Sequence, residues 1–300
     1  MTSITCHTKL SLNKKEQINE LFIAAHKTDD KLPVSEDIIY SLNYTYSYHL
    51  IATNDQKIVG YLNLTKSRLE NLTTAELIVY PSMRGLGIGK ALIYAGIAKS
   101  KSKLTIWARN NLNTTQTIAH SMNFMIKCKL SKMYRSLDNL PSLHRSNHIR
   151  IKTYLSLLNI KEVLKVNNAA FLWHLEQSSW VMHDIIKEYS KPWFDPDGLF
   201  VAYDQKSGKI VGFHWTKVHW KLNDTYYYNN VGEVYVLGID LPVQMCGIGS
   251  IITLTGLKHL AKLNCKNAIL YVNSNNLKAI TTYKNLGFKV FSTDVAYAIR

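Results

Sequence analysis

The spacing of apolar and polar positions along the chain predicts a mixed α/β fold. Apolar residues recur every three to four positions in four segments, which predicts helices over 14–26, 87–100, 160–168 and 247–263. Short apolar runs predict strands over 49–52, 58–64, 199–203 and 210–218. Hairpin turns are expected at Asn54-Asp55 and at 205–208. Strands and helices therefore alternate through both halves of the chain.

An internal repeat divides the chain into two halves. The segment LIVYPSMRGLGIG (77–89) and the segment LGIDLPVQMCGIG (237–249) share a strand, a turn and a closing Gly-Ile-Gly, at an offset of 160 residues. WARNNLNTTQTIAHSMNF (107–124) lies over YVNSNNLKAITTYKNLGF (271–288) without a gap, at an offset of 164. The polar stretch DNLPSLHRSNH reads as the linker. We therefore predict two tandem domains, over 1–140 and 150–300.

Each copy contains a pair of glycines that opens a helix directly after a strand, in GLGIGKALIYAGIAK and in CGIGSIITLTGLKHLAK. Free backbone N–H groups and the helix dipole attract phosphate at such a point, and glycine lets a ligand approach the backbone. A tight turn that binds nothing would use the same residues, but its duplication in the same context favours a ligand. Neither loop has the third glycine of a dinucleotide fingerprint or the Lys-Ser/Thr of a P-loop.

Arg84-x-x-Gly87-x-Gly89 and Gln244-x-x-Gly247-x-Gly249 resemble the pyrophosphate-binding motif of the GNAT family of N-acetyltransferases, and the segment 271–288 resembles a later motif of that family. The resemblance implies two tandem GNAT domains, each a mostly antiparallel mixed sheet flanked by helices, and one acetyl-CoA per domain. The cofactor-binding residues that it implies in the first half are Leu77, Ile78, Val79, Gly85, Leu86, Gly87, Ile88, Gly89 and Lys90. In the second half they are Leu237, Gly238, Ile239, Gln244, Met245, Cys246, Gly247, Ile248, Gly249, Ser250, Asn276, Leu277, Lys278, Ala279, Ile280 and Thr281.

The second half resembles in particular a tandem branch of the family that acetylates the cysteine amine of a cysteinyl-glucosaminyl-inositol, in the segments 167–180, 211–220, 231–240, 270–288 and 292–297. This resemblance implies that Glu233 is the general base and that Tyr283 is the general acid for the departing thiolate. From the pattern alone, a solvated strand glutamate and a packed helix tyrosine remain alternatives. Backbone N–H groups of 237–239 are expected to polarise the thioester carbonyl, with an irregular strand at Gly238.

The repeat supplies an internal control on these assignments. The offsets pair Glu233 with Thr73 and Tyr283 with Ala119, and neither first-half side chain can do the work of its counterpart. Glu76 is near Thr73, but an odd displacement along a strand turns it to the opposite face. We therefore expect the first domain to bind acetyl-CoA without catalysing transfer.

For the acceptor, the same resemblance implies contacts from Glu36, Glu176, Lys217, Glu233 and Tyr271. Carboxylates suit an acceptor that carries an ammonium group and many hydroxyls, because each oxygen accepts charge-assisted hydrogen bonds. Glu36 reads equally well as a helix N-terminal charge. None of the eleven histidines is assigned a catalytic role, and no metal site is predicted.

Composition adds little to this picture. The net charge of +15 favours anionic partners, but the basic residues are scattered, so a nucleic acid is not the expected partner. No apolar run approaches a membrane span, and the four cysteines form no metal or disulfide pattern, which fits a monomer in a reducing cytoplasm. Two alternatives stay open: a tandem GNAT enzyme for another amine, such as an aminoglycoside, a polyamine or a protein N-terminus, and a non-catalytic CoA-sensing or nucleic-acid-binding protein.

Overall fold

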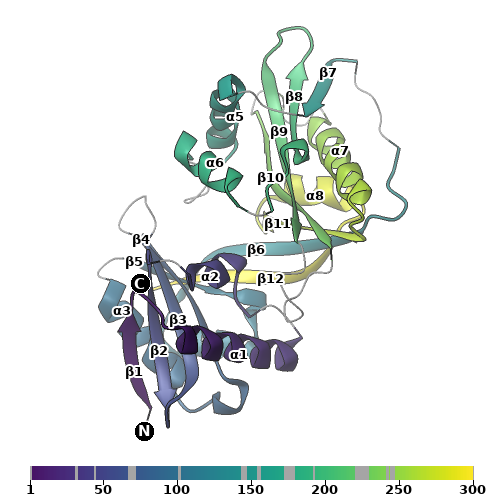
Figure 1. Cartoon of the computed structure of the whole chain (residues 1–300). Coiled ribbons are helices and arrows are strands. Elements are labelled where there is room, and N and C mark those ends of the chain that lie inside the picture. Colours follow the sequence, from purple (N-terminus) through teal and green to yellow (C-terminus); the bar gives the residue numbers. More distant parts are fainter. Residues whose placement is uncertain are drawn as a thin grey trace. The chain divides into compact units, whose positions relative to one another are not determined.

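A computed structural model describes residues 2–30, 33–43, 45–66, 72–100, 103–142, 147–153, 157–171, 180–191, 193–219, 230–240, 243 and 247–299. The chain divides into two compact units: Met1–Leu130 with Ser292–Arg300, called the first unit, and Ser131–Phe291, called the second unit. Every predicted helix and strand is present, with ends that lie within three residues of those expected (Figure 1).

The first unit contains a six-stranded sheet in the order β1-β2-β3-β4-β5-β12. β4 and β5 run parallel, and the other neighbours in this order run antiparallel. Its elements are β1 (Ser3–His7), α1 (Leu12–Asp29), α2 (Glu36–Ser41), β2 (Ser47–Asn54), β3 (Lys57–Lys66), β4 (Leu72–Val79), η1 (Pro81–Met83), α3 (Ile88–Ser100), β5 (Lys103–Ala108), η2 (Arg109–Asn111), α4 (Asn113–Ser121) and the start of β6 (Met125–Ser136).

Helices cover both faces of this first sheet. α1 lies on one face, where Phe22 meets the ring of Tyr61 edge-on, and α3 lies on the other, where Leu92 packs among the apolar side chains of β2, β3 and β4. The turn between β2 and β3 is formed by Asp55 and Gln56, both in the left-handed region, at φ 46° and 67°. The predicted turn pair Asn54-Asp55 therefore begins one residue too early, because Asn54 still pairs with β3.

The second unit repeats this arrangement, with strands in the order β6-β11-β10-β9-β8-β7. β10 and β11 are parallel, whereas β7, β8, β9 and β10 pair antiparallel in succession. α5 and α6 pack on one face and α7 and α8 on the other. The elements are β7 (Ile149–Thr153), α5 (Leu157–Ala170), α6 (Met182–Tyr189), η3 (Pro196–Gly198), β8 (Leu199–Asp204), β9 (Ile210–His219), β10 (Val231–Ile239), α7 (Ile248–Lys262), β11 (Asn267–Asn273), α8 (Leu277–Asn285) and β12 (Lys289–Ala298).

The compact units differ from the predicted ranges 1–140 and 150–300 in where two strands belong. β6 begins in the first unit but ends in the second, next to β11. β12 begins in the second unit but ends in the first, next to β5, where Val295 pairs with Ala108. Each sheet is thus closed by the strand that follows α4 or α8 of the other repeat. A linker search by composition cannot detect such an exchange, because it reads only the polar stretch between the halves.

Candidate active site

The two repeats differ by one residue in the strand that precedes the glycine loop. In the second unit, the register of β9 with β10 shifts between Val234 and Val236, so Tyr235 is the extra residue of a β-bulge. In the first unit, β3 and β4 keep one continuous register over the corresponding stretch. The predicted irregularity at Gly238 therefore lies at Tyr235. Gly238 pairs regularly with Phe213, whose ring fills the space that a Cβ of Gly238 would need.

The bulge changes which first-unit residue corresponds to Glu233. Glu233 pairs with Lys217 on β9, and the residue at the same position of the first-unit ladder, counted from the glycine loop, is Thr74. The predicted counterpart Thr73 is wrong by one residue, because a gapless offset ignores the inserted residue. Since successive strand residues face opposite sides, Glu76 shares a face with Thr74. The first unit therefore does carry a carboxylate on the face that corresponds to Glu233.

Both repeats separate from their parallel neighbour before the glycine loop. β4 pairs with β5 as far as Glu76, and β10 pairs with β11 as far as Val234, while each continues along its antiparallel partner to its last residue. Residues 77–79 and 237–239 therefore extend beyond the parallel pairing, and these six residues are the strand residues predicted to bind the cofactor.

Glu233 lies on the face of the second sheet that α5 and α6 cover. Its side chain is buried, and its Oε2 lies 2.6 Å from Nε2 of His219, which is also buried. Lys217, the cross-strand partner of Glu233, projects from the same face, because Trp215, Lys217 and His219 alternate along β9. The carboxylate therefore has an imidazole beside it and an ammonium group on the neighbouring strand.

An aromatic and charged wall surrounds Lys217. Its Nζ lies 5.2 Å from the ring centre of Trp193 and 5.3 Å from that of Tyr235. The Tyr235 hydroxyl donates to Glu188 at 3.0 Å, and Lys191 forms an ion pair with the same carboxylate at 2.7 Å. Aromatic faces stabilise the ammonium of Lys217 by cation–π attraction. This face thus offers two carboxylates and two ammonium groups in a setting with little water.

The other residues predicted to bind the acceptor fall in different places. Tyr271 is half-exposed and lies two positions beyond Ile269, the parallel partner of Glu233, so it projects from the same face as Glu233. Glu36 begins α2 in the first unit, in the first turn of that helix, which suits its reading as a helix N-terminal charge. Glu176 lies outside the described residues. Lys217, Glu233 and Tyr271 are therefore brought together on one face.

Tyr283, the predicted general acid, lies in α8 on the opposite face of the second sheet. Its side chain is 7% exposed, and its ring packs edge-on against Phe288. Burial raises the pKa of Tyr283 to about 12, so the hydroxyl keeps its proton at neutral pH. Asn276 caps the same helix by accepting from the backbone N–H of Ala279 at 3.1 Å. A phenol held protonated at this point can donate to a thiolate.

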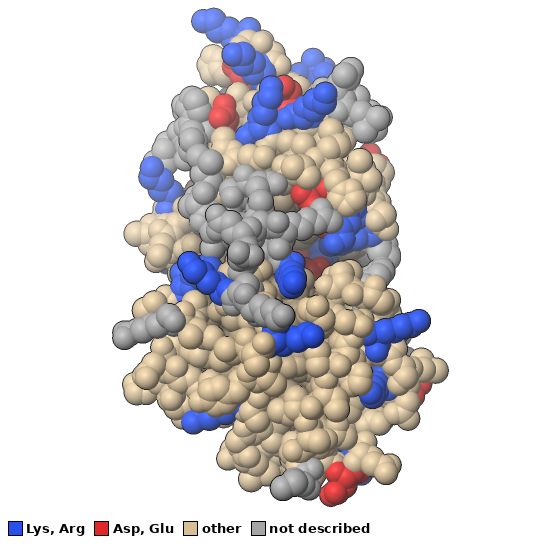
Figure 2. Space-filling model, turned by 90° about the vertical axis from the view of Figure 1, so that its left-hand side faces the viewer, with Lys and Arg blue, Asp and Glu red and all other residues tan. Residues whose placement is uncertain are grey.

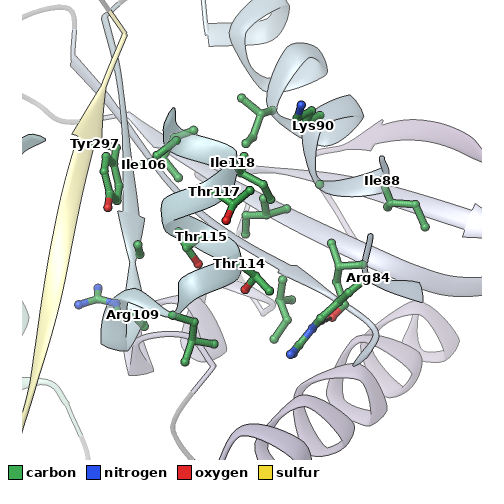
Figure 3. Close-up of a pocket in the computed structure, with 18 of the residues that line it drawn as sticks. Arg84, Ile88, Lys90, Ile106, Arg109, Thr114, Thr115, Thr117, Ile118 and Tyr297 are labelled. Atoms are coloured by element: carbon green, nitrogen blue, oxygen red, sulfur yellow. Dashed lines mark hydrogen bonds between the residues drawn. The ribbon is translucent and has the colours of Figure 1, made fainter. Parts of the chain in front are cut away.

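The first unit contains a cavity of about 460 Å³ beside its glycine loop (Figure 3). Eight of the nine predicted cofactor residues of this half line it, and the ninth, Leu86, is exposed. Figure 3 shows Arg84 and Arg109 on opposite sides of the threonines of α4. The lining residues that bear on function are Leu77, Ile78, Val79, Arg84, Gly85, Gly87, Ile88, Gly89, Lys90, Arg109, Asn110, Thr114, Thr115, Thr117, Ala119 and Tyr297.

Part of this lining was not predicted. The residues 112–117 of α4 are the repeat partners of 276–281, which were predicted to bind cofactor in the second half, so the offset of 164 could have identified them. Ala119, the partner of Tyr283, also lines the cavity, where its small side chain leaves space. Tyr297 comes from the last strand, and its hydroxyl donates to Asn111 at 2.8 Å. No local pattern indicates that contribution from the end of the chain.

The glycine loops have the backbone that a phosphate site needs. Gly87 and Gly247 each precede a helix in the left-handed region, at φ 80° and 77°, where other residues are strained. The N–H groups of the first turns of α3 and α7 have no acceptor inside their helix. Arg84 holds the first loop against α1 through two contacts of 2.8 Å with Asp29. The predicted residues 244–246 of the second loop lie outside the described residues.

Glu76 of the first unit is fully engaged by its neighbours. Arg109 contacts Glu76 at 2.5 Å and Asp294 at 2.9 Å. The backbone N–H and the hydroxyl of Ser35 donate to the same Glu76 carboxylate at 2.8 Å and 2.7 Å. Both carboxylates are buried, so the network offsets the cost of desolvating them. The first unit thus has a carboxylate on the relevant face, but Arg109 and Ser35 occupy it through three short contacts.

The surface and the remaining side chains add no competing site. Figure 2 shows Lys and Arg side chains in separated groups among uncharged residues on the face it presents. None of the described helices is both long and apolar enough to cross a membrane. Within the part of the chain that the structure describes, no group of three His, Cys, Asp or Glu side chains is placed to hold a metal ion.

A family model and solved structures both match this fold. The family model described as "Acetyltransferase (GNAT) family" matches twice, at residues 15–124 and 167–288, which together make up more than half of the chain. The chain therefore belongs to the GNAT acetyltransferase family, and the predicted class of two tandem GNAT domains is confirmed. Among solved structures, a GCN5-related N-acetyltransferase from Sphaerobacter thermophilus shares the fold, with a TM-score of 0.78 over 99% of this chain and 95% of that one, at 16% identity.

Within that family, two curated proteins similar to this chain carry the same name. A protein named mycothiol acetyltransferase from Mycolicibacterium smegmatis is 39% identical over 99% of both chains. Its namesake from Mycobacteroides abscessus is 38% identical over 96% of this chain and 97% of its own length. A tandem GNAT protein from the clavulanic acid biosynthesis pathway shares the fold alone, with a TM-score of 0.77 over 100% of this chain and 98% of that one, at 14% identity. The similarity thus extends through both repeats, and the predicted resemblance is confirmed.

Proposed function

We propose that this protein transfers the acetyl group of acetyl-CoA to the cysteine amine of cysteinyl-glucosaminyl-inositol, the reaction that completes mycothiol. The observation that carries the proposal is the 39% identity with a mycothiol acetyltransferase over almost the whole of both chains. Identity at this level through both repeats supports the same reaction if the site also fits it. The groups of the second unit are therefore considered next.

The second unit supplies the groups that acetyl transfer needs. Glu233 takes the ammonium proton of the acceptor, directly or through a water, which frees the amine lone pair to attack the thioester carbon. The C–S bond then breaks, Tyr283 donates its proton to the thiolate of CoA, and the proton that the acylated nitrogen releases restores the phenol of Tyr283. The two groups lie on opposite faces of the sheet, and the separation of β10 from β11 beyond Val234 gives access to the thioester from both sides. Backbone N–H groups of 237–239 stabilise the negative oxygen of the tetrahedral intermediate.

Lys217 and Tyr271 complete the acceptor side. An acceptor with a sugar and an inositol presents many hydroxyls and no large apolar surface, so it suits a wall of charged and aromatic side chains. Lys217 donates to hydroxyl oxygens, and the half-exposed ring of Tyr271 offers both a stacking face and a phenolic oxygen. Glu36 and Glu176 remain proposed acceptor residues on the resemblance alone.

The first unit binds a second acetyl-CoA in its cavity and does not turn it over. The residues fit that ligand: the left-handed glycines and the free N–H groups of α3 suit the pyrophosphate, and the backbone of 77–79, which extends beyond the pairing with β5, suits the amides of the pantetheine arm. The engaged Glu76 and the alanine at 119 leave this copy without acid or base. Bound acetyl-CoA then stabilises the first unit by mass action.

A thiol-release assay with the desacetyl acceptor tests the proposal. Wild-type protein should release one CoA per acceptor consumed, and mass spectrometry should find the added acetyl on nitrogen rather than on sulfur. An acceptor panel with an aminoglycoside, a polyamine and a peptide N-terminus serves as the control. Equal turnover of these unrelated amines would contradict the assigned acceptor while leaving the acetyltransferase chemistry intact.

A further inference from the structure

One buried histidine contacts the proposed base. His219 ends β9, 7% exposed, and its Nε2 lies 2.6 Å from Oε2 of Glu233, which is 6% exposed. The two residues are diagonal neighbours on adjacent strands, because Glu233 pairs with Lys217 and His219 pairs with Val231. A contact this short between a nitrogen and a carboxylate oxygen requires a proton between them. The strand register, and not a mobile loop, fixes the pair.

We infer that His219 is a positioning residue for the general base: its Nε2–H donates to Oε2 of Glu233 and so orients and stabilises the carboxylate that takes the acceptor's proton. This inference rests on the proposed role of Glu233. The proton from the ammonium group is taken up by the Glu233 carboxylate, whose Oε2 keeps the hydrogen bond from His219. The imidazole itself keeps its proton throughout, so the pair takes up one proton per turnover and releases it to water with the product.

A hydrogen bond to the ionised form of a carboxylate lowers its pKa, and loss of that bond raises it. Other titratable groups lie on the same face of the sheet: Lys217 on β9, the Tyr235 hydroxyl on β10, Glu188 of α6 with Lys191 just beyond it, and Tyr271 on β11 with Lys132 of β6 beside its ring. All of these remain in a His219 variant. A change in the pH profile of that variant therefore reports the missing imidazole donor.

The test compares His219→Leu, which has no donor, with His219→Gln, whose side-chain amide can place an N–H where Nε2 was. In His219→Leu, kcat should fall about 10- to 100-fold with the acceptor KM nearly unchanged, and the acid limb of the kcat profile should move up by about one pH unit. His219→Gln should keep the acid limb in place and recover most of kcat. The upward direction follows because the base works only when ionised.

His259→Leu is the matched control. His259 also lies 2.6 Å from a carboxylate, that of Asp195, but it projects from α7, on the other face of the sheet. Its loss should leave the acid limb unchanged. A folded His219→Leu with a wild-type acid limb would overturn the inference, and so would a His219→Gln as impaired as His219→Leu. If His219→Leu does not fold, His219→Asn replaces it, since its amide is too short to reach Oε2.

The outcome is separable from that of the proposed function. Absence of acceptor turnover in the wild type, or full activity of Glu233→Gln, would contradict the proposed function itself. An active wild type, an inactive Glu233→Gln and an unaffected His219→Leu would contradict only the positioning role.

Discussion

The two units share the strand, the glycine loop and the following helix, but they use the sheet face beside that strand differently. In the second unit the face carries Glu233 and Lys217 next to an aromatic wall. In the first unit the corresponding face carries Glu76, which Arg109 and Ser35 hold through three short contacts. The two copies therefore share the strand, the loop and the helix, and they differ in what surrounds the carboxylate on that face.

The difference between the copies reduces to small local changes. A one-residue bulge at Tyr235 puts two consecutive residues, Tyr235 and Val236, on the face of the second sheet that α5 and α6 cover. The first unit lacks that bulge and places alanine where the second has Tyr283. Under the proposed function, the first unit keeps a cavity beside its glycine loop without the proposed acid and base, so cofactor binding and catalysis would be separable in this protein.

The largest expected effect distinguishes the carboxylate of Glu233 from that of Glu76. Glu233→Gln removes the base while keeping shape and hydrogen bonds, so kcat should fall about 10²- to 10⁴-fold. Glu76→Gln should leave kcat unchanged but lower the unfolding temperature, because Arg109 then lacks one of its two charged partners. Steady-state kinetics and thermal unfolding of both variants measure this. Similar losses of kcat in both would make the first unit catalytic after all.

The next effect concerns acid stability. His214 is fully buried in the second unit, and burial lowers its pKa to about 4. The unfolded chain, with a pKa of about 6.5, then binds more protons below that pH. The contribution of neutral His214 to the free energy of unfolding should therefore be fully present above about pH 6.5. The free energy of unfolding should fall by about 3 kcal/mol as the pH drops toward 4.

The first-unit residue that corresponds to His214 is Leu62, because each pairs with the same position of the next strand. A helix glycine lies against each side chain: Gly96 against Leu62 and Gly256 against His214. His214→Leu should flatten the loss of stability between pH 7 and 5, and Leu62→His should steepen it, because each swap moves the buried imidazole. Denaturant unfolding at several pH values measures both slopes. Unchanged slopes would mean that other groups dominate acid unfolding.

A smaller effect is expected from the general acid. Tyr283→Phe should lower kcat about 10- to 100-fold while the binding of acetyl-CoA changes little, because the phenol acts on the leaving thiolate. Tyr297→Phe is the matched variant in the first unit, where only a hydrogen bond to Asn111 is lost, and kcat should stay at the wild-type value. An equal weakening of acetyl-CoA binding and kcat in Tyr283→Phe would assign this tyrosine to packing.

The smallest effect tests the two cofactor sites separately. Valine is strained at the positive φ of either loop glycine by about 1–2 kcal/mol, which weakens CoA binding about tenfold. Gly87→Val should weaken one of two CoA-binding events about tenfold in a calorimetric titration and leave turnover intact, whereas Gly247→Val should raise the acetyl-CoA KM. A single equivalent in the wild type would mean that the first cavity does not bind CoA.

Much of the fold could be predicted from the sequence, because its strands and helices carry strong apolar periodicity. The repeat could place α4 over α8 for the same reason, since no residue is inserted between 107 and 124 relative to 271 and 288. The offset of 160 gave Glu233 the wrong first-unit counterpart, Thr73, because the inserted Tyr235 shifts the ladder by one residue. A bulge of this kind leaves no mark in composition or spacing.

The candidate site was predictable to the extent that motifs mark it. Lys217 and Glu233 are cross-strand partners, as motifs on adjacent strands suggest. The contact of His219 with Glu233 was missed, although the alternation in HWTKVH puts Trp215, Lys217 and His219 on one face. Arg109 and Asp294 could not be paired from sequence, because their positions meet only through strand exchange.

The last strand of the chain has a consequence for how the protein is made. Residues 292–298 close the first sheet beside β5 and contribute Asp294 and Tyr297 to the first unit. On the ribosome, the first unit must therefore wait for residues 131–291, which take roughly 10–30 s at usual rates of synthesis. During that interval β5 offers an unpaired edge to other chains. A nascent chain of this protein is thus exposed to misassembly until residues 292–298 emerge, and a truncation before residue 292 damages the half that was made first.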